Sequence, residues 1–566
     1  MERRWWTLLV VCASMFMLLI DVNVVVVALP DIQHALDASF AGLQWMTDAY
    51  ALTLAALLLT AGFLADRYGR RRVFVVGLVV FTGGSLLCGL APNASTLVLF
   101  RAVQGSGGAI LSATSLALLA GSFQGRQRGV AFGVWGAVAG VATGLGPVLG
   151  GVLTGGVGWR GIFLVNVPVG IAALVITVRR VDESRTAGDR RIDWPGVVTL
   201  TTGLFGLVYG LITASEAGWG QRGVPLWLGL AALCLVAFAL VERRVPEPMF
   251  DPSLLRIPTF VGGSVAAFAM NASLYAVFVY LVLYLQNGLG GSPLVTGVRL
   301  LTGSAFTFVA AFAAGRLTSR VPVRWLIGPG LGLVGAGLLL MRGLTAGSEW
   351  THLIAGLVVS GLGAGLVNPP LASTAVGVVP PHRSGMASGA NQTFRQIGIA
   401  VGVACYGTIF AASLHATLRH RLADIPALSG QVDQIAGAVH RGVTDRAVAL
   451  APTEARDALA DAIRAGFADS LDAVLLVAGL LALVGGVLAT ALIRSRDFVA
   501  PRPPVPGRTP DVGQTPVPGQ TTDPRQTPDV GQTPVPGQTT DPRQTTDPSR
   551  KDSPTSGRSP SGRPAK

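Results

Sequence analysis

Long apolar runs recur along this chain and alternate with short polar segments. A helix needs about 20 mostly apolar residues to cross the hydrocarbon core of a bilayer. The first run continues to Pro30, too long for the apolar region of a cleaved signal peptide, so we interpret it as a spanning helix. The pattern predicts an all-α membrane protein with fourteen spans, at residues 5–29, 42–65, 72–91, 96–120, 129–153, 161–180, 195–214, 224–242, 260–286, 296–315, 324–343, 350–372, 390–412 and 471–493.

The arginines cluster before the first span and after every even-numbered span, whereas the loops after the odd-numbered spans up to the eleventh carry few cations. Positive residues are retained on the cytoplasmic side of a membrane, so this distribution predicts that both termini are cytoplasmic. The clusters are Arg3 and Arg4, Arg67 and Arg70 to Arg72, Arg126 and Arg128, Arg179 and Arg180, Arg190 and Arg191, Arg243 and Arg244, Arg316, Arg320 and Arg324, Arg383, and Arg494 and Arg496.

The composition excludes several classes of function. Half of the 566 residues are hydrophobic, 13% are charged and the mean hydropathy is +0.55, so the chain is not a soluble protein. The net charge of +13 lies in loops rather than on one face, which argues against nucleic acid as a partner. The four cysteines lie in spans without a C-x-x-C pair, and we expect neither metal nor cofactor. No phosphate-binding G-x-x-x-x-G-K-[ST] and no nucleophile–base pattern occurs, so we expect neither ATP-driven transport nor an enzyme.

Four regions follow from the spans. Residues 1–180 form a first six-helix bundle, 181–259 a linker with spans 7 and 8, and 260–496 a second bundle. The second bundle includes a predicted external loop, 413–470, whose second half has apolar residues at Ala455, Leu459, Ile463 and Phe467, the spacing of an amphipathic helix. Residues 497–566 form a predicted disordered cytoplasmic tail that contains an 18-residue tandem repeat, and its partner, if any, is unknown.

The loop after span 2 reads G-F-L-A-D-R-Y-G-R-R-R, from Gly62 to Arg72. Gly62 and Gly69 permit a tight turn and a close approach of helices. Asp66 is placed to pair with a neighbouring cation or to cap another helix, and Arg67, Arg70 and Arg71 hold the loop on the cytoplasmic side. A degraded copy, G-R-L-T-S-R from Gly315 to Arg320, has Ser319 where the first has the acid, as expected if the two halves of the chain are related.

Two charged residues lie well inside spans of the first bundle. Asp21 lies about eight residues before the external end of span 1, and Arg101 about five residues into span 4 from the same side. At 1.5 Å per residue the two side chains differ in depth by about 5 Å or less, so they are placed to pair. A carboxylate whose cation moves away in one conformation couples protonation to shape, while a static buried ion pair that only fixes packing is the alternative.

The neighbouring motifs carry a family resemblance. L-L-I-D-V-N-V-V-V-V-A-L-P at 18–30, R-A-V-Q-G-S-G-G-A at 101–109 and W-R-G-I-F-L-V-N-V-P-V-G at 159–170, with L-Y-L-Q at 283–286 and T-F-R-Q-I-G at 393–398, resemble the fourteen-span drug:proton antiporters of the major facilitator superfamily. The resemblance covers residues 5–493. It implies two six-helix bundles plus two extra central helices, a conformational latch at 62–72, proton exchange at Asp21 tuned by Arg101, and export of an amphipathic drug or antibiotic-like compound. The family usually has Thr and Asn two and five residues after the first-span acid, where this chain has Asn23 and Val26.

Span 5 resembles the antiporter motif of that family, although Ala142 replaces one of its glycines. The small residues let span 5 pack closely on a neighbour, and the proline bends the helix; the resemblance adds a hinge or a seal against leakage. The motif residues are Gly133, Gly146, Pro147, Gly150 and Gly151, and polar residues that are candidates to line a substrate cavity are Asn23, Asn271 and Gln286.

Two further interpretations remain open at this point. The chain is alternatively a narrow-specificity exporter of a small metabolite, or a membrane sensor that does not transport and whose tail binds a cytoplasmic partner. A sensor has no need of Asp21, Arg101 and the Asp66 loop together, which favours a transporter.

Overall fold

The computed structural model describes residues 2–38, 40–184, 193–245, 248–423, 428, 431, 434–435, 448 and 451–499. These residues belong to a compact unit that ends at Ala500. The tail from residue 500 on, with its tandem repeat, lies outside the described residues, as do Arg190 and Arg191. Helices make up nearly all of the described part, and none of it is strand.

The first half of the unit is a bundle whose helices match the first six predicted spans. Short turns join them, and the last span is broken after one turn into α6 and α7. The helices are α1 (Arg3–Leu36), α2 (Phe40–Tyr68), α3 (Arg70–Gly89), α4 (Ala94–Ser122), α5 (Gly125–Val157), α6 (Gly161–Leu164) and α7 (Asn166–Arg180).

Two helices of the predicted linker, α8 (Trp194–Ala217) and α9 (Gly223–Glu242), pair with each other. α8 also packs on α2 and on α15 (Ser384–Leu422), where the two bundles meet.

The second bundle contains the remaining helices, and its first span is interrupted by two π-helical turns, η2 and η3. This span consists of α10 (Pro258–Met270), η2 (Asn271–Tyr275), α11 (Ala276–Leu283) and η3 (Tyr284–Gly288). The other long helices of the bundle, besides α15, are α12 (Pro293–Leu317), α13 (Arg324–Leu340), α14 (Ile354–Gly377) and α18 (Arg456–Leu492). Short 3-10 turns are η1 (Pro252–Arg256), η4 (Trp350–Leu353), η5 (Pro381–Arg383), η6 (Thr453–Ala455) and η7 (Ser495–Asp497).

The helix lengths agree with a multi-pass membrane protein. Thirteen helical segments of the described residues are long and apolar enough to cross a bilayer, and α13, with 17 residues, is an apolar helix just short of that length. With α13 included, the order and positions of the helices follow the fourteen predicted spans.

The segment 413–470 differs from a simple loop. α15 continues to Leu422 and α18 begins at Arg456, so both ends of the predicted loop are helical. Leu459, Ile463 and Phe467 are buried in the same core cluster as Leu414 and Leu418 of α15. The predicted amphipathic helix is therefore present, and it forms one continuous helix with the last span. Its apolar face packs on the extension of α15.

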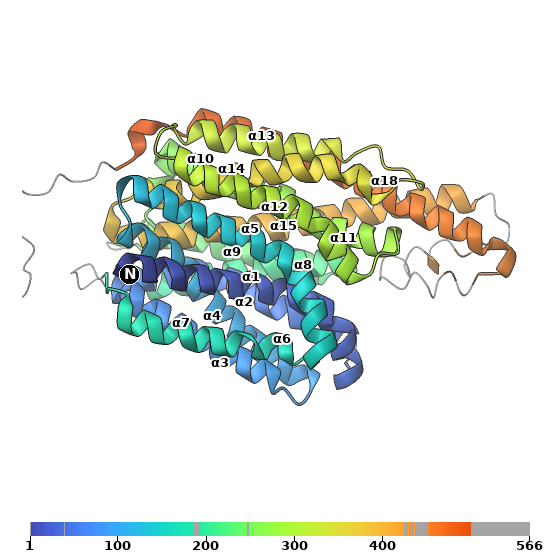
Figure 1. Ribbon diagram of the computed structural model, residues 1–566, viewed down its shortest axis with the longest axis horizontal. Helices are drawn as coiled ribbons and strands as arrows, with labels where there is room; N and C mark the ends of the chain where they lie inside the picture. Colours follow the sequence, from blue (N-terminus) through green and yellow to red (C-terminus); the bar gives the residue numbers. More distant parts are fainter. Residues whose placement is uncertain are drawn as a thin grey trace, which may run out of the picture. The chain divides into compact units, whose positions relative to one another are not determined.

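Two seams join the bundles. α2 lies against α15, and α5 lies against α12, while α14 and α15 also reach α5 and α4 of the first bundle (Figure 1). Both seams contain glycines at the contact: Gly62 faces Gly385 and Gly389, and Gly315 faces Gly129 and Gly133. Without side chains at these positions the helix backbones approach closely, which is a common way to pack helices in membranes.

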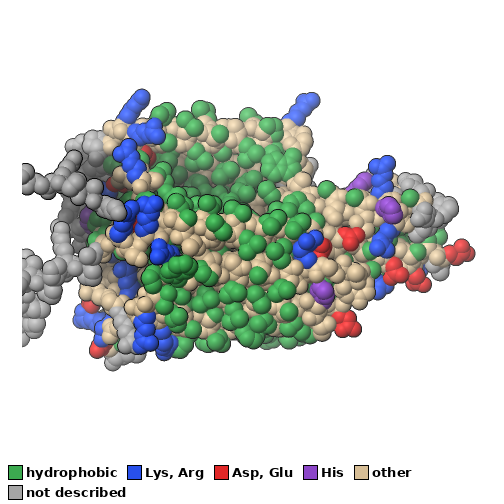
Figure 2. Space-filling view, turned by 90° about the horizontal axis from the view of Figure 1, so that it is seen from above, with side chains coloured by type: hydrophobic (Ala, Val, Ile, Leu, Met, Phe, Trp, Pro, Cys, Tyr) green, Lys and Arg blue, Asp and Glu red, His purple; other side chains and the backbone are tan. Residues whose placement is uncertain are grey.

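The surface separates into an apolar belt and two polar ends. On the face shown in Figure 2, arginines crowd the end of the unit where α1 begins, hydrophobic side chains cover the middle, and acidic side chains lie toward the opposite end. We call the end where α1 begins the arginine-rich end, and the opposite end the far end.

Candidate functional site

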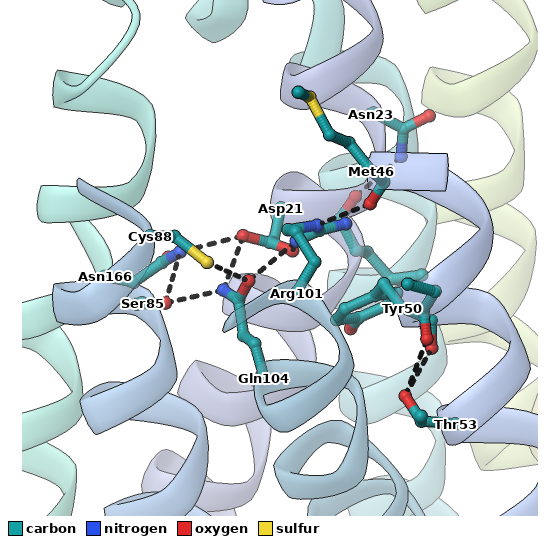
Figure 3. A network of polar contacts seen from close by, with 12 residues as sticks. Asp21, Asn23, Met46, Tyr50, Thr53, Ser85, Cys88, Arg101, Gln104 and Asn166 are labelled. Carbon is teal, nitrogen blue, oxygen red and sulfur yellow. Dashed lines mark hydrogen bonds and ion pairs between the residues drawn. The ribbon is translucent and has the colours of Figure 1, made fainter. Parts of the chain in front are cut away.

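Asp21 of α1 and Arg101 of α4 form a fully buried ion pair inside the first bundle (Figure 3). Arg101 Nη1 lies 2.5 Å from Asp21 Oδ2, and each residue is only 1% exposed. The contact predicted from their matched depths is therefore present. Removing two charges from water costs several kcal/mol for each ion, which their attraction offsets only when further hydrogen bonds satisfy the remaining polar atoms.

Three further polar side chains complete the network around this pair. Gln104 donates from Nε2 to Asp21 Oδ1 (2.8 Å) and to Ser85 Oγ (2.6 Å), and it accepts from Arg101 Nη1 (2.7 Å). Asn166 of α7 donates to Asp21 Oδ1 (3.3 Å) and to Ser85 Oγ (3.4 Å). Four helices, α1, α3, α4 and α7, thus contribute to one network that holds Asp21.

Sequence reasoning did not single out Gln104, Asn166 or Ser85 as site residues. A signal existed for the first, because Gln104 follows Arg101 by three residues and so lies on the same face of α4. Asn166 stands in the quoted 159–170 motif, whereas nothing in the sequence marks Ser85.

Arg101 is also held by α2. Its Nε donates to the carbonyl oxygen of Met46 (3.1 Å), and its guanidinium lies 4.2 Å from the centre of the Tyr50 ring. The glycine after Gln104 permits this approach, since a Cβ on Gly105 would lie 2.9 Å from Tyr50 Cα. The guanidinium group therefore contacts a carboxylate, an amide, a backbone carbonyl and an aromatic face at once.

A second set of contacts closes the seam between α2 and α15 at the arginine-rich end. Asp66 accepts hydrogen bonds from the backbone N–H groups of Gly385 (2.9 Å) and Met386 (2.8 Å), at the start of α15. Arg70 pairs with Asp66 at 3.1 Å and donates to the carbonyl oxygen of Pro381. Both roles predicted for Asp66, a salt bridge and a helix cap, occur together, and we call this arrangement the Asp66 cap.

The other charged residues of the 62–72 segment have separate partners. Glu183 accepts from the backbone N–H groups of Arg71 and Arg72, both at 3.2 Å, and so caps the start of α3. Arg71 donates to the carbonyl oxygen of Val178 (2.6 Å), and Arg67 lies over the Tyr68 ring at 5.4 Å. Gly69 has a φ of +104°, a backbone conformation that side chains disfavour, which explains the glycine at this turn.

A third contact at this end ties the linker to the turn before α15. Asp251 pairs with Arg383 of η5. Partial burial acts to raise the pKa of Asp251, but hydrogen bonds from Ser253 and Arg383 outweigh it and hold the pKa below its ordinary value. Asp251 is therefore an ionised partner of Arg383 at neutral pH.

The antiporter-motif glycines of α5 have different neighbours. Gly133 faces α12, while Gly146 and Gly150 face α1, at Asn23 and Val27 respectively. Gly151 has open space where a Cβ would be, because it follows Gly150 by one residue and lies on another face of the helix. α5 is continuous through Pro147, whose side chain lies outside the described residues.

The predicted cavity residues Asn23, Asn271 and Gln286 are not among the lining residues of the two cavities described below. The amides of Asn23 and Asn271 instead donate to the carbonyl oxygens of their own helices at Leu19 (2.6 Å) and Ala267 (2.8 Å), and Gln286 is half-buried in η3. A cavity of about 60 Å³ between α5 and the second bundle is lined by the group Gly140, Leu274, Tyr275, Phe278, Leu281, Leu300, Gly303, Ser304, Thr307, Leu357, Ser360, Gly361 and Ala364. We call it the central cavity. Pockets that hold drug-sized ligands measure several hundred Å³, so this cavity is too small to hold one in the arrangement described.

A larger recess of about 800 Å³ opens at the far end, beside the starts of α12 and α18. It lies among Arg299, Glu349, Trp350 and Arg464, and the guanidinium of Arg299 lies 5.4 Å from the Trp350 ring. Within the described residues, no group of three or more His, Cys, Asp and Glu side chains is placed to hold a metal ion.

Comparison with protein families identifies the architecture. The family model described as "Major Facilitator Superfamily" matches residues 11–403. This chain belongs to the major facilitator superfamily. It is thus a multi-pass membrane protein of a transporter family and not an enzyme, and the Asp66 cap and the Asp21 network are parts of a transporter.

Curated members of the superfamily are similar over most of their length. The puromycin resistance protein pur8 of Streptomyces alboniger is 38% identical over 74% of this chain and 84% of its own. The multidrug resistance protein Stp of Mycobacterium tuberculosis is 35% identical over 74% and 78%. The tetracenomycin C resistance and export protein of Streptomyces glaucescens is 33% identical over 90% and 95%.

Solved structures of superfamily members share the fold at low sequence identity. The human organic anion transporter MFSD10 superimposes with a TM-score of 0.58 at 13% identity, covering 86% of this chain and 99% of its own. A bacterial homologue of the lysosomal transporter Spinster gives 0.54 at 19% identity, covering 88% and 99%.

Proposed function

We propose that this chain is a proton-coupled antiporter that exports amphipathic drugs or antibiotic-like compounds across the cytoplasmic membrane by alternating access. The names of its relatives, which are resistance and export proteins, support drugs or antibiotics as the substrate class. The orientation proposed for it, with both termini cytoplasmic, rests on the arginines gathered at the end where α1 begins.

The observation that carries proton coupling is the closed network around Asp21. In this arrangement Asp21 is a carboxylate, because it accepts from Arg101, Gln104 and Asn166 and pairs with a cation. A proton on Asp21 would remove the counter-ion of Arg101, which lies in the same apolar interior. Proton uptake by Asp21 therefore favours departure of Arg101 from it, and a shift of α4 would carry Arg101 away.

The movement of α4 links this event to the seams between the bundles. α4 contacts α15 directly, through a hydrogen bond of 2.8 Å from Gln392 of α15 to Ser112 of α4. A shift of α4 on protonation would therefore displace α15, whose first turn is held by the Asp66 cap. In the proposed cycle, the cap stabilises the state in which the arginine-rich end is closed, and its release admits substrate from the cytoplasm.

The test is transport driven by a pH gradient in vesicles that contain the purified protein. Asp21→Asn keeps the shape and hydrogen bonding of the side chain but cannot exchange a proton, so gradient-driven accumulation of drug should fall to background while the protein still folds. Asp472→Asn is a matched control, since Asp472 of α18 also pairs with an arginine, Arg342 at 2.9 Å, but on a partly exposed surface. That variant should transport normally.

If Asp21→Asn still concentrates drug against a gradient, proton coupling at Asp21 is wrong, and Asp48 of α2 becomes the next acid to test. Loss of transport in both variants would indicate that the ion pairs are needed for folding. Size-exclusion chromatography of each variant distinguishes a misfolded protein from a folded protein that does not transport.

A further inference from the structure

The two bundles each bury an arginine, but only one of the two arginines has a carboxylate. Arg101 pairs with Asp21, whereas Arg395 of α15, 9% exposed, has two neutral amides as partners. Its Nε donates to Asn391 Oδ1 (3.1 Å) and its Nη1 to Asn368 Oδ1 (3.0 Å). Its Nη2 is buried without a hydrogen-bond partner, and no carboxylate of the described residues lies within ion-pair distance.

Arg395 is buried inside the protein. It follows the first residue of α15 by eleven positions, or roughly 17 Å at 1.5 Å per residue. Its side chain is bonded to two amides inside the bundle and does not extend along the protein surface to the lipid headgroups, as the side chains of arginines near helix ends do. Charged groups in such positions are costly and are kept where they meet a partner in the protein interior or a ligand.

The polar contacts of this arginine lead to the wall of the central cavity. Tyr275 lines the cavity, and its hydroxyl lies 3.4 Å from Asn368 Nδ2, the side chain that also accepts from Arg395. Ala364 of α14 lines the cavity as well and precedes Asn368 by four residues, so the two lie on the same face of α14. Asn368 and Tyr275 therefore connect the guanidinium to the cavity wall.

The helix backbone is irregular at the same place. Tyr275 ends the π-helical turn η2, and Asn368 is followed by Pro369 and Pro370 inside α14. π-turns occur frequently at functional sites, and prolines release backbone groups and kink a helix. Interrupted helices near the middle of the membrane are also how many transporters build a binding site. The barrier between Arg395 and the cavity is thus made of elements that are able to rearrange.

The walls of the cavity define the rest of the ligand. Leucine and aromatic side chains dominate, with Leu274, Phe278 and Leu281 on one side and Leu300 and Leu357 on the other. Such walls favour an apolar, partly aromatic body, while the unpaired guanidinium disfavours a positive group and binds an acidic one.

We propose that Arg395 is the anion receptor of the substrate site, and that the cargo of this transporter includes amphipathic organic anions whose carboxylate binds the free Nη2. The inference rests on the proposed function, because it names the substrate class of the same transport site. Binding of the carboxylate supplies the counter-charge that Arg395 lacks in the second bundle, as Asp21 supplies it to Arg101 in the first.

The test uses three probes with one apolar body and different charge: 1-pyrenebutyrate, its methyl ester and 1-pyrenebutylamine. Binding is measured by calorimetry on the full chain in lipid nanodiscs, with empty nanodiscs subtracted. The wild type should bind the acid at least about tenfold more tightly than the ester or the amine, since a charge-assisted bond to arginine is among the strong ones. Arg395→Gln should lose this preference and still bind the ester, and Arg395→Lys should keep part of it.

Arg299→Gln is the matched control, because Arg299 lies in the same bundle with a buried, unpartnered Nη1, but in the recess at the far end. It should leave the preference for the acid unchanged. Equal binding of acid and ester, preference for the amine, no binding of any probe, or an acid preference that survives Arg395→Gln would each overturn the proposal. So would thermal stabilisation by chloride that depends on Arg395 without an acid preference, which would identify a site for an inorganic ion.

The same probes separate this proposal from the proposed function. If the acid binds through Arg395 but a pH gradient does not drive accumulation of any probe in vesicles, antiport is wrong and the anion site stands. If the gradient drives accumulation of the ester or the amine without preference for the acid, antiport stands and the anion site is wrong.

Discussion

The segment Gly62–Arg72 and its degraded copy at Gly315–Arg320 lie on the two seams between the bundles. Both have close glycine packing, but only the first has a charged helix cap. In both, the first glycine faces a pair of glycines on the opposing helix, Gly385 and Gly389 in one and Gly129 and Gly133 in the other. Only the first seam carries a charged cap. Ser319, four residues after Gly315 as Asp66 is after Gly62, lies in the turn after α12 and donates instead to the carbonyl oxygen of Arg316 (2.9 Å).

The missing acid is not the whole difference. Gly385 is the second residue of α15, so its N–H is one of those that lack a partner within the helix. Gly129, which faces Gly315 as Gly385 faces Gly62, is the fifth residue of α5, and its N–H already bonds within the helix. Because α5 begins one turn earlier relative to its seam, an acid at position 319 would find no free N–H groups beside it.

The comparison shows that close packing and electrostatic locking are separate properties of a seam. The glycines alone set the distance between the backbones, whereas the lock needs both an acid on one helix and the start of a helix opposite it. The following changes break or sharpen this distinction, from the largest expected effect to the smallest.

Substitution of the seam glycines should have the largest effect, and it should be similar at the two seams. A Cβ at Gly62 would meet the carbonyl group of Gly385, and a Cβ at Gly315 would lie 2.6 Å from Gly133 Cα, so neither seam has room for a side chain. We expect Gly62→Val and Gly315→Val each to lower the free energy of unfolding by about 1–3 kcal/mol or more. The midpoint of thermal unfolding in detergent measures this loss.

Gly83→Val is the control for both glycine variants, because a Cβ at Gly83 of α3 would have no neighbour within 4 Å. It should unfold near the wild-type temperature. A Gly62→Val or Gly315→Val protein as stable as the Gly83→Val protein would mean that the seams are looser than the structure shows.

Loss of the Asp66 charge should have an intermediate effect, confined to the first seam. Asp66→Asn weakens the cap on α15 and the pair with Arg70, and a lost cap costs about 0.5–2 kcal/mol. The closed state of the arginine-rich end should therefore lose population by about tenfold, which corresponds to about 1.4 kcal/mol. Transport should slow, with little change in substrate affinity.

Spin labels report this shift directly when they are attached at Arg72 and Arg496, two exposed positions at the arginine-rich ends of the two bundles, in a background without native cysteines. The variant should show a larger share of long distances than the wild type. An unchanged distance distribution together with normal turnover would reduce the 62–72 segment to a signal for orientation in the membrane.

Restoring the acid in the degraded copy should have the smallest effect. Ser319→Asp supplies the side chain but not the helix start, so the midpoint of thermal unfolding should stay within the range of ordinary surface substitutions, about 0.5 kcal/mol. Labels across the α5–α12 seam should show no new closed population. A clear stabilisation of that seam would show that the acid alone makes the lock, and that the position of the helix start does not matter.

The sequence by itself determined the properties that depend on one helix at a time. Apolar run length gave the order of the spans, because the thickness of the bilayer fixes how many residues a helix needs. Depth along a helix placed Asp21 level with Arg101, since the rise per residue is constant. Spaced glycines marked the close contacts of α2, α5 and α12.

Only the tertiary structure decided which faces of the helices meet. That Gln104, Asn166 and Ser85 converge on Asp21, that Asp66 caps a helix more than 300 residues away, and that Arg395 lies beside amides rather than an acid all depend on the rotation of each helix about its axis. Rotation is weakly encoded here, because the residues that face lipid and those that face other helices are both apolar. The partners of a buried charge are therefore set by the packing of the bundle as a whole.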